Sequence, residues 1–232
     1  TVTAVTSNGA TDPSTLATFG ADRILTIALN ATPFGMAQQL ATMAEGATGM
    51  VIAGTSLGRS IAPALAALAG GALSTNTTSV PSSVSPVVVE RGAFSSKGIE
   101  TIALSGGIPI VSFVPNSVGI HERAGEGTIE SGEATGTDLM TITEKTIASG
   151  KVALPEAEVV VSAGRGLKGP EHWGMIEELA SVLGAATACS KPVSDIGWRP
   201  HSEHVGQTGI QVNPNLYIAI GISGAIQHLA GV

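Results

Sequence analysis

Residues 216–228 read LYIAIGISGAIQH, an apolar run followed by a stretch of small and polar residues that ends in a histidine. A similar segment, VGQTG at residues 205–209, precedes it. Both patterns predict an apolar strand that stops at a polar, glycine-rich loop. Free backbone N–H groups beside Ser, Gln and His side chains suit a large, planar, phosphorylated ligand. The two segments therefore predict a cofactor site.

Strands and helices alternate through most of the remaining chain. Strands are expected at residues 1–5, 23–29, 49–54 and 157–163, and helices at 32–45, 61–69 and 171–184. This alternation favours right-handed crossovers and a mostly parallel sheet. The stretch from Ser74 to Thr128 differs, because Gly, Ser and Pro separate its short β-rich runs, which are residues 85–90, 100–104 and 108–113. These runs predict added antiparallel strands.

The periodic pattern fades between Ile142 and Ala157, where polar residues and a predicted Gly150–Lys151 turn interrupt it. We therefore expect an α/β protein of two domains, each a mostly parallel sheet flanked by helices. The first would span residues 1–153 and have a β-rich latter half. The second would span residues 154–232 and contain the cofactor site.

Composition narrows the class of protein. The chain of 232 residues is 43% hydrophobic and only 3% aromatic, so Val, Ile, Leu and Ala must fill the core, as in parallel sheets buried on both faces. Its net charge of −7 disfavours binding to a nucleic-acid backbone. The single cysteine, Cys189, cannot form an internal disulfide. No apolar run approaches the roughly 20 residues that span a bilayer, so a membrane-embedded protein is not expected.

Residues 164–169 read GRGLKG, a G-x-G-x-x-G pattern between a predicted strand and a predicted helix. Glycine there lets the backbone approach a phosphate, and the helix N-terminus offers free N–H groups. The alternative is a glycine-rich turn that only connects the two elements. An NAD-binding domain would carry an acidic residue about 20 positions further on, where the sequence instead has AATACS at residues 185–190.

Together with SAGRGLKG at residues 162–169 and ACSKPVSDIG at residues 188–197, the opening stretches closely resemble the electron transfer flavoprotein alpha subunit. From Val159 to Val232 the sequence matches the family nearly motif for motif. Before Val159 it matches the family only in its general pattern. It implies Rossmann-like domains, the second of which binds FAD. The family's first strand and helix, and its last strand and helix, have no counterpart here, so we expect a chain truncated at both ends.

The resemblance also implies roles for individual residues. Arg165 would stabilise negative charge on the reduced flavin, and Thr208 would hydrogen-bond to the reactive ring nitrogen. Lys191 stands where the family usually has arginine, so it keeps the charge but not the planar stacking surface. His228 would lie near a ring carbonyl. The implied FAD-binding residues are Arg165, Gly166, Ser190, Lys191, Val205, Gly206, Gln207, Thr208, Ser223, Gly224, Ala225, Ile226, Gln227 and His228.

As a member of this family the chain would be an electron carrier without a substrate of its own. It would pair with a beta subunit through its first domain, accept electrons from acyl-CoA and related dehydrogenases, and pass them to a membrane quinone oxidoreductase. The expected compartment is the cytoplasm in a bacterium or the mitochondrial matrix in a eukaryote. An NAD(P)-dependent oxidoreductase and a structural subunit without cofactor are the alternatives.

Two nearby histidines, His201 and His204, raise the possibility of a metal site. No other Cys or His accompanies them, and Pro200 indicates a loop, so we expect both to be solvated and no metal to bind. Cys189 is expected to be a small buried hydrophobe.

Overall fold

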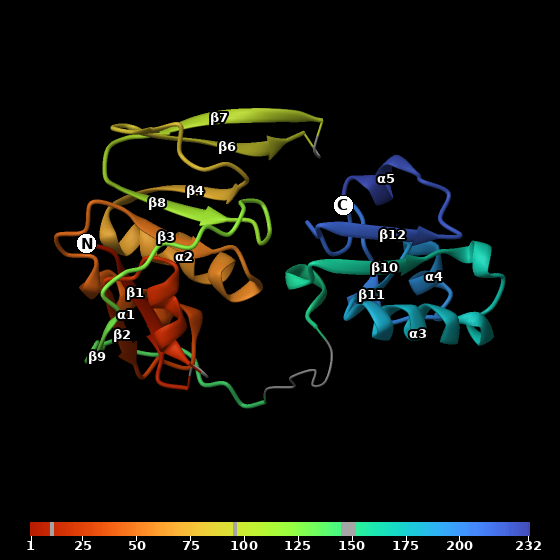
Figure 1. The fold of residues 1–232 in the computed structure, drawn as a ribbon, viewed down its shortest axis with the longest axis horizontal. Coiled ribbons are helices and arrows are strands. Elements are labelled where there is room, and N and C mark those ends of the chain that lie inside the picture. Colours follow the sequence, from red (N-terminus) through yellow and green to blue (C-terminus); the bar gives the residue numbers. More distant parts are fainter. Residues whose placement is uncertain (10–11, 95–96, 145–151) are drawn as a thin grey trace. The chain divides into compact units, whose positions relative to one another are not determined.

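The computed structural model describes most of the chain (Figure 1). The described residues are 1–9, 12–94, 97–144 and 152–232, so the predicted Gly150–Lys151 turn lies outside them. The chain forms two compact units. The first comprises Thr1–Val89, Ile102–Phe113 and Val118–Lys145, and the second comprises Glu90–Thr101, Val114–Ser117 and Thr146–Val232.

The chain before residue 145 alternates strands and helices and then becomes β-rich, as expected. Its strands are β1 (Thr3–Ser7), β2 (Arg23–Ile27), β3 (Met50–Ala53), β4 (Gly71–Thr77), β5 (Ser83–Val84), β6 (Val87–Ala93), β7 (Gly98–Leu104), β8 (Ile108–Phe113) and β9 (Thr128–Ser131). Its helices are the 3₁₀ helix η1 (Pro13–Thr18), α1 (Pro33–Met43) and α2 (Ser56–Ala69). The second α-helix begins before the predicted Ile61, because the Thr55 hydroxyl caps it by accepting from the Gly58 N–H at 3.2 Å.

These strands form two sheets. One has the order β1-β2-β9 and is parallel throughout. The other has the order β3-β8-β4-β6-β5, with β7 paired to β6. Strands β5 and β6 are antiparallel, as predicted for this region.

The prediction of an antiparallel strand at residues 108–113 is wrong, because β8 lies between β3 and β4 and is parallel to both. Its side chains explain this position. Ile110 packs against Leu65 of α2 on one face of the strand, and Val111 packs against Val89 of β6 on the other. A strand buried on both faces is typical of the interior of a parallel sheet.

An acidic side chain from a distant segment holds the turn that begins α1, whose N-cap is Thr32, with its hydroxyl accepting from the Gly35 N–H at 3.2 Å. The Asp138 carboxylate accepts hydrogen bonds from the Ala31 N–H at 2.9 Å and from the Thr32 N–H at 3.0 Å. It also accepts from the Thr32 hydroxyl at 2.5 Å. Hydrogen bonding, chiefly from Thr32, lowers the pKa of Asp138. A carboxylate at this position satisfies free N–H groups and complements the helix dipole.

The chain after residue 152 repeats the β–α alternation. Its elements are η2 (Leu154–Glu156), β10 (Val159–Ala163), η3 (Arg165–Leu167), η4 (Pro170–His172), α3 (Gly174–Leu183), β11 (Ala186–Cys189), α4 (Lys191–Asp195), η5 (His201–Glu203), β12 (Leu216–Ile220) and α5 (Ile226–Leu229). The three strands form a parallel sheet in the order β11-β10-β12. Together with the first unit, this confirms the α/β class.

Alternate residues of β10 serve two different cores. Val161 points to a cluster that contains Trp173 and Ile176, which belong to the segment that includes α3. Val160 points to the opposite cluster, which contains Val205 and is packed against Tyr217 of β12. The sheet is therefore covered on both faces, and the second face carries the loop that follows η5.

Replacing Ile176 by alanine is expected to destabilise the second unit. Ile176 is 1% exposed, so Ile176→Ala removes buried methyl groups and leaves a cavity, at a cost of about 2–5 kcal/mol in the free energy of unfolding. Both tryptophans, Trp173 and Trp198, pack in the same cluster, so their fluorescence during urea denaturation reports this unit. The neighbouring Met175 is 59% exposed, and Met175→Ala should change stability by less than about 0.5 kcal/mol. Equal effects of the two changes would contradict the described packing.

Replacing Asp138 by asparagine is expected to lower the melting temperature at neutral pH and to have less effect in acid. Because folding lowers the pKa of Asp138, its stabilisation is complete above the unfolded-state pKa and is lost as the pH falls through the folded-state pKa. The difference between wild type and Asp138→Asn should therefore narrow on acidification. Calorimetric melts over a pH series measure it. A difference that is constant with pH would show that the carboxylate charge does not stabilise the helix.

Candidate functional site

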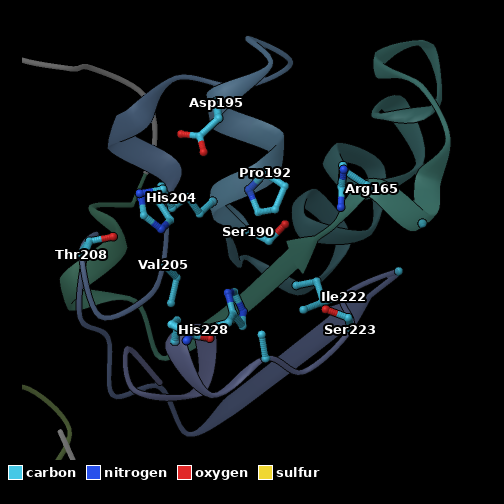
Figure 2. A pocket seen from close by; sticks show the side chains of 15 residues that line it. Arg165, Ser190, Pro192, Asp195, His204, Val205, Thr208, Ile222, Ser223 and His228 are labelled. Atoms are coloured by element: carbon cyan, nitrogen blue, oxygen red, sulfur yellow. The ribbon is translucent and has the colours of Figure 1, made fainter.

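The carboxyl ends of the three parallel strands in the second unit open onto a cavity of about 530 Å³ (Figure 2). This volume lies within the range of cofactor and small-molecule sites. Residues from all three strand ends, from the loop after η5 and from α5 surround it. The lining residues are Arg165, Gly166, Ser190, Lys191, Pro192, Asp195, His204, Val205, Thr208, Gly221, Ile222, Ser223, Ala225, Gln227 and His228.

Glycine lets two of the strand ends approach each other closely. The Gly166 N–H donates to the Gly221 carbonyl at 3.0 Å, and the Gly164 N–H donates to the Ile220 carbonyl at 2.9 Å. A Cβ atom at Gly166 would lie 2.5 Å from the Gly221 Cα. Gly221 itself has a φ of +63°, which favours glycine. The G-x-G element thus fixes the floor of the cavity by backbone contact.

The third strand end supplies a serine and a short helix. The Ser190 N–H donates to the Ala163 carbonyl at 3.1 Å, which ties the end of β11 to the end of β10. Lys191 and Asp195 begin and end α4, and both line the cavity. The position of α4 therefore places a cation and a carboxylate in the lining of the cavity.

Positive charge exceeds negative charge around the cavity. Arg165 and Lys191 are both exposed and line it, and Asp195 alone is acidic among the described lining residues. Within the described residues, neither cation forms an ion pair, whereas Arg199 pairs with Glu203 at 2.6 Å and with Glu177 at 3.0 Å. Two unpaired cations at a concave site favour an anionic ligand.

The VGQTG segment does not end a strand, so that part of the prediction is wrong. Single bridges join His204 to Cys189 and Val205 to Ile210, and the 3₁₀ helix η5 precedes them. The loop is instead held by contacts with the C-terminal segment, since the Gln207 N–H donates to the Gln227 carbonyl at 2.7 Å. Figure 2 shows Thr208 and Arg165 at opposite sides of the pocket.

His228 is buried at the cavity and is oriented by Tyr217. The Tyr217 hydroxyl lies 2.9 Å from His228 Nε2. Burial raises the pKa of Tyr217 to about 12, so the hydroxyl keeps its proton and can donate. Burial, reinforced by His204, lowers the pKa of His228. A neutral imidazole that accepts at Nε2 carries its proton on Nδ1.

The Nδ1 atom of His228 is buried and has no hydrogen-bond partner within the described part of the chain. A backbone interaction with Val205 partly opposes the lowering of the His228 pKa. A buried polar atom without a hydrogen-bond partner is costly in a folded protein.

The structure brings most of the predicted site residues to one cavity. Four of them do not line it: Gly206, Gln207, Gly224 and Ile226. Five residues that line the cavity were not predicted from the sequence: Pro192, Asp195, His204, Gly221 and Ile222. Four of the five lie inside the quoted motifs, so a signal was present. The exception, His204, immediately precedes the VGQTG segment.

The prediction that His201 and His204 are both solvated is wrong for His204, which is 7% exposed, while His201 is exposed. Cys189 is fully buried, as expected, and burial raises the pKa of its thiol to about 12. Among the residues that the structure describes, no group of His, Cys, Asp or Glu is placed to hold a metal ion. No helix in that part of the chain is long and apolar enough to cross a membrane.

Comparison with known proteins identifies both parts of the chain. Residues 1–137 match the family model of the electron transfer flavoprotein domain, and residues 153–232 match that of the electron transfer flavoprotein FAD-binding domain. The cavity therefore lies in the part of the chain that matches a FAD-binding domain, which argues against the NAD(P) alternative.

Individual relatives agree with this match. Electron transfer flavoprotein subunit alpha of Bacillus subtilis is 33% identical, over 92% of this chain and 69% of that protein. The subunit alpha of Syntrophomonas wolfei is 36% identical, over 93% of this chain and 71% of that protein. The mitochondrial subunit alpha of Oryza sativa subsp. indica is 35% identical, over 79% of this chain and 53% of that protein. The chain belongs to the electron transfer flavoprotein alpha subunit family.

Proposed function

We propose that the cavity of the second unit holds FAD and that the chain acts as an electron carrier through it. The observation that carries this proposal is the meeting of three parallel strand ends at a glycine-lined floor with two unpaired cations beside it. Ligands of open α/β sheets bind at such strand ends. Of the residues expected from the sequence to contact FAD, those that line the cavity are Arg165, Gly166, Ser190, Lys191, Val205, Thr208, Ser223, Ala225, Gln227 and His228. The proposed contacts of Gly206, Gln207, Gly224 and Ile226 would lie where FAD extends beyond the cavity.

The residues present fit a phosphorylated flavin. Gly166 lines the cavity, and its lack of a side chain lets the Gly221 backbone approach closely, which keeps both strand ends at the site. Arg165 and Lys191 offer positive charge to phosphate groups or to a reduced ring system. His228 lines the cavity, and the Tyr217 hydroxyl 2.9 Å from its Nε2 orients the ring before a ligand binds.

When bound, FAD supplies the electron-accepting and electron-donating group, and the protein sets its electrostatic environment. Arg165 and Lys191 would stabilise the negative charge that reduction adds to the cofactor. Thr208 would offer its hydroxyl, and His228 would hold a proton on Nδ1 while Tyr217 fixes its ring. In this proposal none of these residues performs acid–base catalysis on a substrate.

The wider electron-transfer role is also proposed. A beta subunit would pair with the chain through a first domain of residues 1–153, while residues 154–232 would form the FAD-binding domain. Electrons would arrive from acyl-CoA and related dehydrogenases and leave to a membrane quinone oxidoreductase. Membership of the alpha subunit family supports this proposal. The bacterial and mitochondrial relatives favour the bacterial cytoplasm or the mitochondrial matrix as the compartment.

Gly166→Ala is expected to weaken FAD binding by about tenfold or more, which corresponds to about 1.4 kcal/mol. The added Cβ atom would lie 2.5 Å from the Gly221 Cα and force the two strand ends apart. The matched control is Gly174→Ala, because a Cβ atom at Gly174 meets nothing within 4 Å. Titration of FAD into apoprotein, followed by quenching of flavin fluorescence, gives both dissociation constants. Wild-type protein that fails to bind FAD would refute the proposed function.

Arg165→Gln is expected to weaken FAD binding about fivefold, about 1 kcal/mol, and to make it less sensitive to salt. The reason is the loss of an unpaired cation that lines the cavity. Lys168 is exposed in the same turn but does not line the cavity, so Lys168→Gln is the control and should retain wild-type affinity. Equal losses in the two variants would indicate a general effect of net charge. Isothermal titration at two salt concentrations distinguishes these results.

A further inference from the structure

His204 occupies an unusual position for a loop histidine. It directly follows η5 and is bridged to Cys189 at the end of β11. Its side chain lines the same cavity as His228, and the residue is only 7% exposed. Figure 2 shows its imidazole beside the cavity, between α4 and the loop that carries Thr208.

The loop after His204 is folded around its imidazole. A Cβ atom at Gly209 would lie 2.7 Å from His204 Nδ1, and one at Gly206 would lie 3.3 Å from His204 Nε2. The Ile210 N–H donates to the His204 carbonyl at 2.8 Å, which closes the loop. The two glycines of VGQTG thus leave room for the ring and hold it in place.

The imidazole nitrogens of His204 have no hydrogen-bond partner within the described part of the chain. Unlike the buried Nδ1 of His228, they are not completely shielded from the cavity. Because the residue is more than nine-tenths buried and lines the cavity, the cavity is the open side of the ring. An imidazole nitrogen placed in this way can bind a polar group of a ligand or take up a proton.

Charged and titratable groups surround this imidazole. Lys191 and Asp195 face it from α4, and His201 lies on η5. His228 interacts with it from α5. Burial, followed by the charge of Lys191, lowers the pKa of His204, and Asp195 partly opposes this shift. The ring is therefore neutral in the resting site, and added negative charge nearby would favour its protonation.

We propose that His204 is a proton-accepting residue of the FAD pocket, which takes up one proton when the bound cofactor gains one electron. This inference rests on the proposed function. The electron comes from an external reductant, such as dithionite or a reduced dehydrogenase flavin, which is thereby oxidised. The proton comes from solvent and binds the ring nitrogen of His204 that carries none in the neutral form. The net charge of the pocket stays constant through the step.

The test is the pH dependence of one-electron reduction in the FAD-loaded protein. The relevant pH range lies between the His204 pKa of the oxidised protein and that of the reduced protein. In this range the equilibrium constant for adding one electron should fall about tenfold per pH unit. This fall corresponds to a decrease of about 59 mV per pH unit in the one-electron reduction potential. His204→Gln keeps hydrogen-bonding capacity but cannot take up the proton, so its dependence on pH should be much weaker. His201→Gln, three residues away on the exposed side of η5, should retain the wild-type slope.

A wild-type slope in His204→Gln would overturn the inference, and so would an equal loss of slope in His201→Gln. Neither result would affect the proposed function as long as both variants bind FAD. A second measurement does not depend on the variant's stability. In the wild-type protein, the His204 ring resonance, assigned by NMR, should titrate at a higher pH after full two-electron reduction, which leaves no unpaired electron to broaden it, than before reduction. An unchanged midpoint would also overturn the inference.

Discussion

The close approach of two turns, at Gly166 and Gly221, is the contact on which the site depends. The hydrogen bond between these residues measures 3.0 Å, and a side chain at either glycine would meet the backbone of the other turn. With the turns in contact, β10 and β12 end at the same level, and the loops that follow them enclose one cavity. Charge, hydroxyl groups and imidazoles are then supplied from elements that this contact has already placed.

Much of the fold follows from local sequence patterns. Alternating apolar runs and helical periods identified β2, α1, β10 and α3, because each element forms one side of a buried core. The place of β8 was not predictable in this way. Its pairing with β3 and β4 depends on contacts with segments far away in the sequence, and the surrounding glycines and prolines resemble those of a hairpin.

The site was predictable where a motif and a strand end coincide, as at Arg165, Ser190 and His228. It was not predictable at His204, whose neighbours Pro200 and Glu203 are typical of a solvated loop. The burial of His204 arises from the folding of a glycine-containing loop around its ring and from the hydrogen bond between that loop and Gln227. Such long-range contacts are absent from any local window of sequence.

The Asp138 carboxylate at the N-terminus of α1 has a consequence for how the two units differ. A helix N-terminus that follows a parallel strand is the usual place for a phosphate in α/β proteins. In the first unit, the chain's own carboxylate accepts from the backbone N–H groups of Ala31 and Thr32 at that place. A phosphate would have to displace this side chain before it could reach them. Two units built on the same strand–helix alternation can thus differ in ligand binding, because one of them already contains its own anion.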